Sequence, residues 1–216
     1  MIDPHAGHWP EGPPVTPDRA LAELRDGNQR FVTGTRIHPN QDAEHRAALA
    51  GAQTPFAVIF GCSDSRLAAE IIFDRGLGDL FVVRTAGHTM GPEVLGSIEY
   101  AVTVLHTPLV VVLGHNSCGA VTAARDAVAG GTQPTGHLRA VVDAIVPSVS
   151  VATSRNIDDI DQIVDIHIQR TVDHLLAHSQ PLARAVAAGT CAVVGMSYQL
   201  GAGEVREVAG QTRALQ

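Results

Sequence analysis

Three short apolar runs, rich in β-branched residues, place the strongest constraint on how this 216-residue chain folds. They cover Phe56–Phe60, Leu80–Val83 and Leu109–Leu113. None of them alternates with polar residues, which is the pattern of parallel strands covered on both faces. Segments with helical spacing lie between them. We therefore expect an α/β fold with an open, mainly parallel sheet and crossover helices.

The later part of the chain extends this prediction. A fourth apolar run, Cys191–Met196, and a last short run, Glu204–Val208, predict about four parallel strands plus a short edge strand. Helices are expected over 92–105 and 120–129, and a longer helical block over about 134–188. Ligands of open parallel sheets bind beyond the carboxyl ends of the strands, so the residues that follow each strand are the first candidates for a site.

The start of the chain differs in character from the rest. Residues 1–16 are rich in Pro, Gly and His and lack periodicity, which predicts a flexible leader ahead of a single domain over 17–216. Thr16 followed by Pro17 is typical of a helix start, and this amphipathic helix should end by Gly34. We expect it to pack on a partner subunit or on its own core.

Charge and composition exclude several classes of protein. The 15 basic side chains against 22 acidic ones give a net charge of -7, which disfavours a nucleic-acid surface. No apolar run approaches the roughly 20 residues of a membrane-spanning helix, and the first residues show no secretory signal. The three cysteines lack the dense spacing of a disulfide scaffold. We expect a cytoplasmic protein without membrane contact.

Cysteine and histidine follow two of the predicted strands. Cys62 follows the first strand, and His115 and Cys118 follow the third. A parallel sheet can bring these ends side by side, and zinc readily takes thiolate and imidazole ligands. A catalytic zinc site keeps three such ligands and one open position. Asp64 is close enough to Cys62 to bind the metal or to pair with Arg66.

Other interpretations of the cysteines are weaker. No Cys-x-x-Cys motif is present, which disfavours a redox pair. Cys191 lies inside an apolar run, where a cysteine is most often a small buried core residue.

The combination of two motifs resembles the β-class carbonic anhydrases. The first is Cys62-Ser63-Asp64-Ser65-Arg66, and the second is His115-x-x-Cys118-Gly119. The resemblance covers roughly residues 17 to 208. It implies a zinc-dependent lyase with one zinc ion per chain, which reversibly hydrates carbon dioxide to bicarbonate and a proton.

The resemblance also implies roles for single residues. Cys62, His115 and Cys118 would be the zinc ligands. Asp64 and Arg66 would form a catalytic pair that orients a zinc-bound hydroxide. By competing with hydroxide, Asp64 would also bind the zinc and inactivate the enzyme at lower pH.

The family further implies a substrate pocket and an assembly. Gln53 would hydrogen-bond carbon dioxide or bicarbonate, and Phe81 and Tyr100 would close the pocket across a dimer interface. We expect Gly119 to let the backbone approach the metal loop closely. The family forms homodimers that often pair into dimers of dimers, so a homo-oligomer is expected.

Some alternatives stay open. Relatives on this fold hydrolyse carbonyl sulfide or carbon disulfide, and a non-catalytic protein would use Asp64 as the fourth ligand of a structural zinc site. His88 is a candidate proton shuttle in a turn near the pocket mouth. The remaining histidines, His167, His174 and His178 among them, show no ligand spacing and are treated as background.

Overall fold

The computed structural model of the chain describes residues 16–209. The predicted leader over 1–16 therefore lies outside the described residues, apart from Thr16. The strands are β1 (Ala57–Cys62), β2 (Leu80–Thr85), β3 (Leu109–His115), β4 (Ala192–Tyr198) and β5 (Val205–Ala209). The helices are α1 (Pro17–Thr33), α2 (Ala43–Ala48), α3 (Ala69–Ile72), α4 (Pro92–Thr103), α5 (Gly119–Val128), α6 (Leu138–Ser154), α7 (Ile160–His178) and α8 (Gln180–Ala187), with short 3-10 turns η1 (Leu49–Gly51) and η2 (Ala86–His88).

The five strands form one sheet in the order β2-β1-β3-β4-β5. The first four strands pair in parallel, and β5 pairs antiparallel with β4. This confirms the predicted mainly parallel sheet with a short edge strand. Because β1 and β3 are parallel neighbours, their carboxyl ends lie at the same edge of the sheet.

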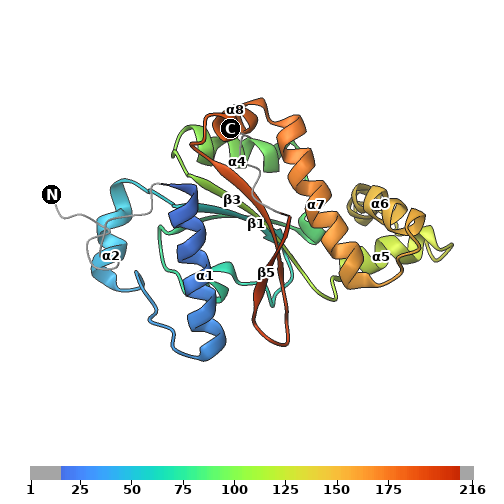
Figure 1. Ribbon diagram of the computed structural model, residues 1–216, viewed down its shortest axis with the longest axis horizontal. Helices are drawn as coiled ribbons and strands as arrows, with labels where there is room; N and C mark the ends of the chain where they lie inside the picture. Colours follow the sequence, from blue (N-terminus) through green and yellow to red (C-terminus); the bar gives the residue numbers. More distant parts are fainter. Residues whose placement is uncertain (1–15, 210–216) are drawn as a thin grey trace.

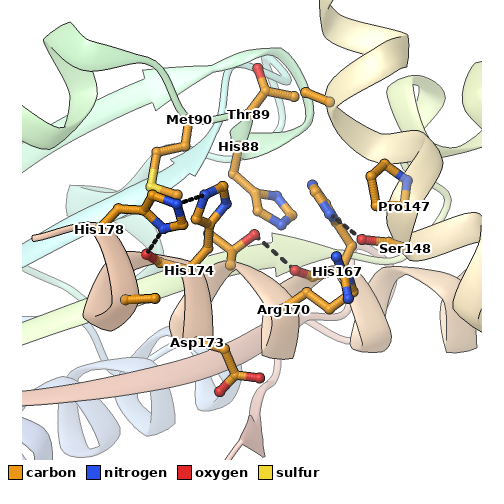
Figure 2. A pocket seen from close by; sticks show the side chains of 13 residues that line it. His88, Thr89, Met90, Pro147, Ser148, His167, Arg170, Asp173, His174 and His178 are labelled. Atoms are coloured by element: carbon orange, nitrogen blue, oxygen red, sulfur yellow. Dashed lines mark hydrogen bonds between the residues drawn. The ribbon is translucent and has the colours of Figure 1, made fainter.

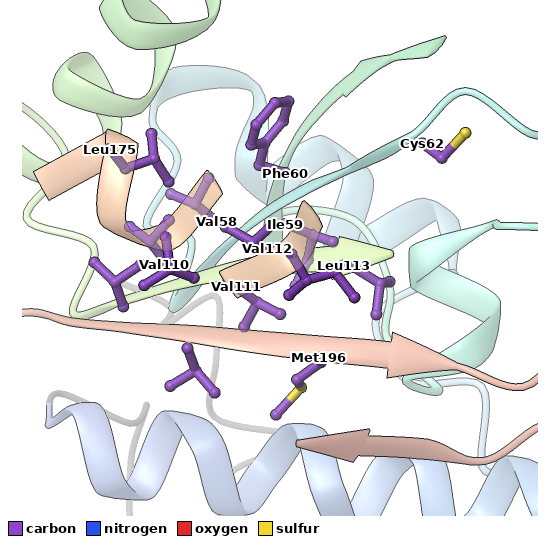
Figure 3. Packing of buried hydrophobic residues seen from close by; sticks show 14 of the residues in the cluster. Val58, Ile59, Phe60, Cys62, Val110, Val111, Val112, Leu113, Leu175 and Met196 are labelled. Carbon is purple, nitrogen blue, oxygen red and sulfur yellow. The ribbon is translucent and has the colours of Figure 1, made fainter. Parts of the chain in front are cut away.

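Helices cover both faces of the sheet, which explains why its central strands are apolar throughout (Figures 1 and 3). Helix α1 packs against one face and α7 against the other, where it contacts β3 and β4. Every residue of β1, β3 and β4 is buried. Strand β2 lies at the edge of the sheet and is only partly buried.

Helix α1 begins and ends as its sequence predicts. The Thr16 side chain accepts a hydrogen bond from the backbone of Arg19, and Gly34 ends the helix in the left-handed conformation. Leu21 and Leu24 are fully buried against the chain's own core. The apolar side of α1 is thus covered within one chain, and a contact of this helix with a partner subunit stays a prediction.

The helical block predicted over 134–188 consists of three helices, α6, α7 and α8. Asp159 caps the start of α7, and Ser179 caps α8, whose second residue is Pro181. Helix α7 lies between the sheet and α6, so α6 forms an outer layer on the α7 face (Figure 1). Among the helices described for residues 16–209, none is long and apolar enough to span a bilayer.

Candidate metal centre and active site

Two cysteines and one histidine meet at the carboxyl edge of the sheet. Cys62 is the last residue of β1, His115 is the last of β3, and Cys118 precedes the first residue of α5. Their ligand atoms lie within 4.8 Å of one another, and the side chains of all three are buried. These are the residues that the spacing of the motifs predicts to converge.

The protonation of the two thiols is coupled. Hydrogen bonding from Cys118, and then from His115, lowers the pKa of Cys62 to about 4. The neighbouring Cys62 sulfur raises the pKa of Cys118, because two thiolates so close together repel each other. The cluster therefore holds one thiolate readily, and a bound cation would allow the second thiol to ionise as well.

His115 is oriented as a metal ligand would be. Its Nδ1 lies 2.9 Å from the backbone oxygen of Asn116, and because a carbonyl only accepts, Nδ1 carries the proton. The buried Nε2 has no hydrogen-bond partner among the described residues. A lone pair on Nε2 with Nδ1–H bound to a carbonyl is the usual state of a metal-binding histidine. The donor set of two sulfurs and this nitrogen fits zinc.

Asp64 and Arg66 form a bidentate ion pair beside the cluster. Arg66 donates from Nε to Oδ1 at 2.9 Å and from Nη2 to Oδ2 at 2.8 Å. The Arg66 guanidinium holds the pKa of the Asp64 carboxyl far below its usual range. Asp64 Oδ2 also lies 3.9 Å from His115 Nε2. The carboxylate is thus at the edge of the cluster and is directed by Arg66.

Two further residues hold this loop, and the sequence analysis did not identify either of them. The backbone N–H of Gly87 donates to the Cys62 sulfur at 3.3 Å. Arg84 donates to the backbone oxygens of Cys62 and Asp64. Both residues follow the second predicted strand. Because the carboxyl ends of neighbouring parallel strands meet at one edge of a sheet, this position in the sequence was a usable signal.

The structure separates three other candidate residues from the cluster. Gln53 is exposed and precedes β1, whereas Cys62 ends it. Phe81 is the second residue of β2, with its ring centroid 6.3 Å from that of Tyr100. Because β1 and β2 run parallel, Phe81 pairs with Val58 near the amino ends of the strands. Within one chain, none of the three lies at the carboxyl edge with the cluster.

The prediction that Gly119 permits a close backbone approach to the metal loop is wrong. A Cβ placed on this residue would meet no heavy atom within 4 Å, so no close backbone approach requires glycine here. The close approach occurs at Gly87, which has a φ of 62° and whose added Cβ would lie 2.8 Å from both Ala120 and Ile145.

His88 lies in the interior and not near a pocket mouth. Its side chain is only 1% exposed, because the turn at Gly87 packs against α5 and α6 and carries the next residue inward. Burial, and then the neighbouring His167, lower its pKa well below 6.5, so the imidazole is neutral at neutral pH. Cys191 is buried in the core as expected, and burial raises its pKa to about 12.

Known proteins share both the sequence and the fold. Residues 57–205 match the family described as carbonic anhydrase. "Carbonic anhydrase 2" of Mycobacterium tuberculosis is 53% identical over 188 residues, which are 87% of this chain and 91% of that protein. A carbonic anhydrase of Mycolicibacterium smegmatis is 51% identical and covers 89% of this chain and 94% of its own length.

Solved structures agree in fold. A tetrameric β-carbonic anhydrase of Sordaria macrospora superposes with a TM-score of 0.71 at 23% identity, covering 89% of this chain and 98% of that one. A β-carbonic anhydrase of Aspergillus fumigatus gives 0.68 at 25% identity, covering 89% and 91%. The chain therefore belongs to the carbonic anhydrase family and, within it, to the β class.

Proposed function

We propose that this enzyme reversibly hydrates carbon dioxide to bicarbonate and a proton, at a zinc ion held by Cys62, His115 and Cys118. The observation that carries the proposal is the convergence of these three ligand atoms beside the Asp64–Arg66 pair. The names of the mycobacterial relatives support the same reaction. The thiolate ligands must remain reduced, which agrees with a cytoplasmic location.

Zinc held there would supply a water of lowered pKa as the nucleophile. Two thiolates and one neutral imidazole cancel the double charge of the ion, so that pKa should fall less than at a site with three histidines. For this reason we expect activity to rise on the alkaline side of neutrality.

Asp64 would aim the nucleophile at the substrate carbon. Its carboxylate stays ionised because of Arg66, so it can accept a hydrogen bond but cannot donate one. The bidentate contact fixes the plane of the carboxylate, which a lysine at position 66 would not reproduce. The same pairing keeps Asp64 directed toward Arg66, which favours an open catalytic site over a structural zinc site closed by this residue.

Gln53, Phe81 and Tyr100 would act on the active site of a second copy of the chain. All three lie away from the cluster of their own chain, and Tyr100 is 47% exposed. The partly buried edge strand β2 carries apolar side chains that a second copy would cover. A homodimer, or a dimer of dimers, would bring these residues to the partner's metal centre. There Gln53 would donate to the oxygen that gains negative charge.

Metal removal tests the proposal. A chelator should abolish carbon dioxide hydration, and one equivalent of zinc should restore it. Cys118→Ala should lose both zinc and activity, whereas Cys191→Ala, the matched control at a buried cysteine outside the cluster, should keep both. Metal content and stopped-flow hydration would be measured on the same samples.

Two results would contradict this account. Full activity in zinc-free protein would remove the metal from the reaction. A zinc-loaded protein that hydrolyses carbonyl sulfide or carbon disulfide but leaves carbon dioxide unchanged would show that the substrate is wrong.

A further inference from the structure

A cavity of about 490 Å³ lies between η2, α6 and α7 and is lined by four histidines (Figure 2). His88 and His167 are buried, whereas His174 and His178 are exposed at the rim. The cavity shares no lining residue with the Cys62, His115 and Cys118 cluster. None of the roles given to residues under the proposed function uses these side chains.

The two histidines at the rim are arranged as a pair of metal ligands. His174 and His178 are one turn apart on α7, and their Nε2 atoms lie 3.2 Å from each other. Two imidazole nitrogens bound to one zinc at about 2.05 Å with a tetrahedral angle would be about 3.3 Å apart. The separation already present therefore matches the spacing that a shared metal ion requires.

The hydrogen bonds of His178 place its lone pair on Nε2, the atom that faces His174. Its Nδ1 lies 3.0 Å from the backbone oxygen of His174, and because that oxygen only accepts, Nδ1 carries the proton. In the neutral ring Nε2 then accepts a hydrogen bond from His174 Nε2–H at 3.2 Å. A metal ion would replace the proton of that bond, with His174 carrying its own proton on Nδ1. A metal-binding histidine typically donates its other N–H to a backbone carbonyl in this way.

The charges around the pair are balanced. Partial burial, and then the neighbouring His178 and Arg170, lower the pKa of His174, which favours its neutral, metal-binding form. Arg170 lines the same cavity and would oppose a cation, but Asp173 lines it as well and offsets that charge.

A second observation points to a ligand in this cavity. His88 lines it, is only 1% exposed, and neither of its ring nitrogens has a hydrogen-bond partner among the described residues. Buried polar groups normally have partners, so the unpaired imidazole beside the cavity is a polar group that the protein itself leaves unsatisfied. Figure 2 shows the His88 ring between those of His174 and His167, and the Met90 side chain extending toward His178.

We propose that His174 and His178 form a second metal site, which binds a divalent late transition-metal ion such as Zn²⁺ or Cu²⁺ through their two Nε2 atoms. Imidazole ligands suit these ions, and Cu²⁺ should bind more tightly than Zn²⁺. The remaining coordination positions are open to water or to a small anion in the cavity. This site is independent of the catalytic metal, so its test does not depend on the proposed reaction.

Equilibrium dialysis of the zinc-loaded enzyme against Zn²⁺ alone, with metal counted by mass spectrometry, tests the site. The wild type should take up one equivalent per chain beyond the catalytic zinc. His178→Gln should weaken this second uptake by at least about tenfold. The double variant His174→Gln/His178→Gln should lose it and keep the first equivalent. His106→Gln, the matched change at an exposed histidine elsewhere, should change nothing.

Spectroscopy gives a readout that a purely structural role would not change. Cu²⁺ added to the zinc-loaded wild type should give an electron paramagnetic resonance spectrum with coupling to two imidazole nitrogens, and the double variant should lose that signal. The proposal is wrong if the wild type takes up no second equivalent. It is also wrong if the double variant, folded and active, retains the uptake and the copper signal.

Discussion

At the scale of single residues, the metal centre depends on contacts that fix each ligand before any metal binds. The Nδ1 of His115 is held by the Asn116 carbonyl, and the Asn116 side chain accepts a hydrogen bond from the backbone of Leu200 at 2.8 Å. The N–H of Gly87 donates to the Cys62 sulfur and holds that ligand in place. These contacts connect the ligand loops to η2 and to the segment that follows β4, so the arrangement of the ligands follows from how these segments pack at the edge of the sheet.

Asp64→Asn should separate metal binding from catalysis. The amide keeps the size of the side chain but presents an N–H where the carboxylate accepts, and it loses the ion pair with Arg66. We expect unchanged zinc content and a fall in kcat of about 10²-fold, the usual cost of losing one electrostatic contact to the transition state. Stopped-flow assays on protein of known zinc content would measure both.

Arg66→Lys is the companion variant. Lysine keeps the positive charge but cannot make the bidentate contact, so kcat should fall while zinc content stays constant. An Asp64→Asn protein that hydrates carbon dioxide as fast as the wild type would refute the role given to this carboxylate.

At the scale of helices and strands, α1 depends on one close approach. A Cβ on Gly27 would lie 1.8 Å from the backbone oxygen of Phe73, so α1 can lie this close to the end of α3 only with glycine. Gly27→Ala should therefore destabilise the protein by about 2–3 kcal/mol. At Gly201 an added Cβ would meet nothing within 4 Å, so Gly201→Ala should leave stability nearly unchanged. Urea denaturation of both variants would test this, and equal midpoints would contradict it.

Sequence patterns predicted these elements well where burial is complete. The runs that form β1, β3 and β4 are apolar because both faces are covered, so they could be located to within a few residues. The division of 134–188 into three helices was not predicted, because its breaks depend on short caps such as Ser179. The pair formed by His174 and His178 was overlooked, although its spacing of one helical turn was a usable signal.

At the scale of the whole molecule, buried neutral histidines make stability depend on pH. Burial lowers the pKa of His167 to about 4, whereas in the unfolded chain the residue titrates near 6.5. Between these values the unfolded state binds a proton that the folded state does not, so the free energy of unfolding should fall as pH decreases. The slope should be about 1.4 kcal/mol per pH unit for each such histidine.

His167→Gln tests this dependence. Glutamine does not titrate, so the slope of stability between about pH 6.5 and pH 4 should become shallower than in the wild type. Denaturation midpoints measured over this range would show it. A variant with an unchanged slope would mean that other groups cause the acid sensitivity.

The proposed dimer would determine which residues form one complete active site. A strand with the six residues of β1 is about 20 Å long, and Gln53 and Cys62 lie at its opposite ends. This distance cannot be inferred from the order of motifs along the chain. For that reason the ligands and the ion pair could be placed together from sequence, whereas the separation of Gln53 from the cluster within one chain became visible only in the structure.

Mixed dimers would test the contribution of Gln53 from the partner. Asp64→Asn and Gln53→Ala should each be nearly inactive alone. When the two are co-expressed, half of the dimers contain one chain of each kind, and one of their two sites combines an intact Asp64 with the partner's intact Gln53. Activity should then recover to about one quarter of wild type. No recovery in proven mixed dimers would place Gln53 in the site of its own chain.

The most direct test of the central claim is stopped-flow carbon dioxide hydration from about pH 6 to pH 9, on protein whose zinc content is known. This account predicts activity that rises with pH at one catalytic zinc ion per chain. A protein with full zinc content that is inactive over the whole range would contradict it.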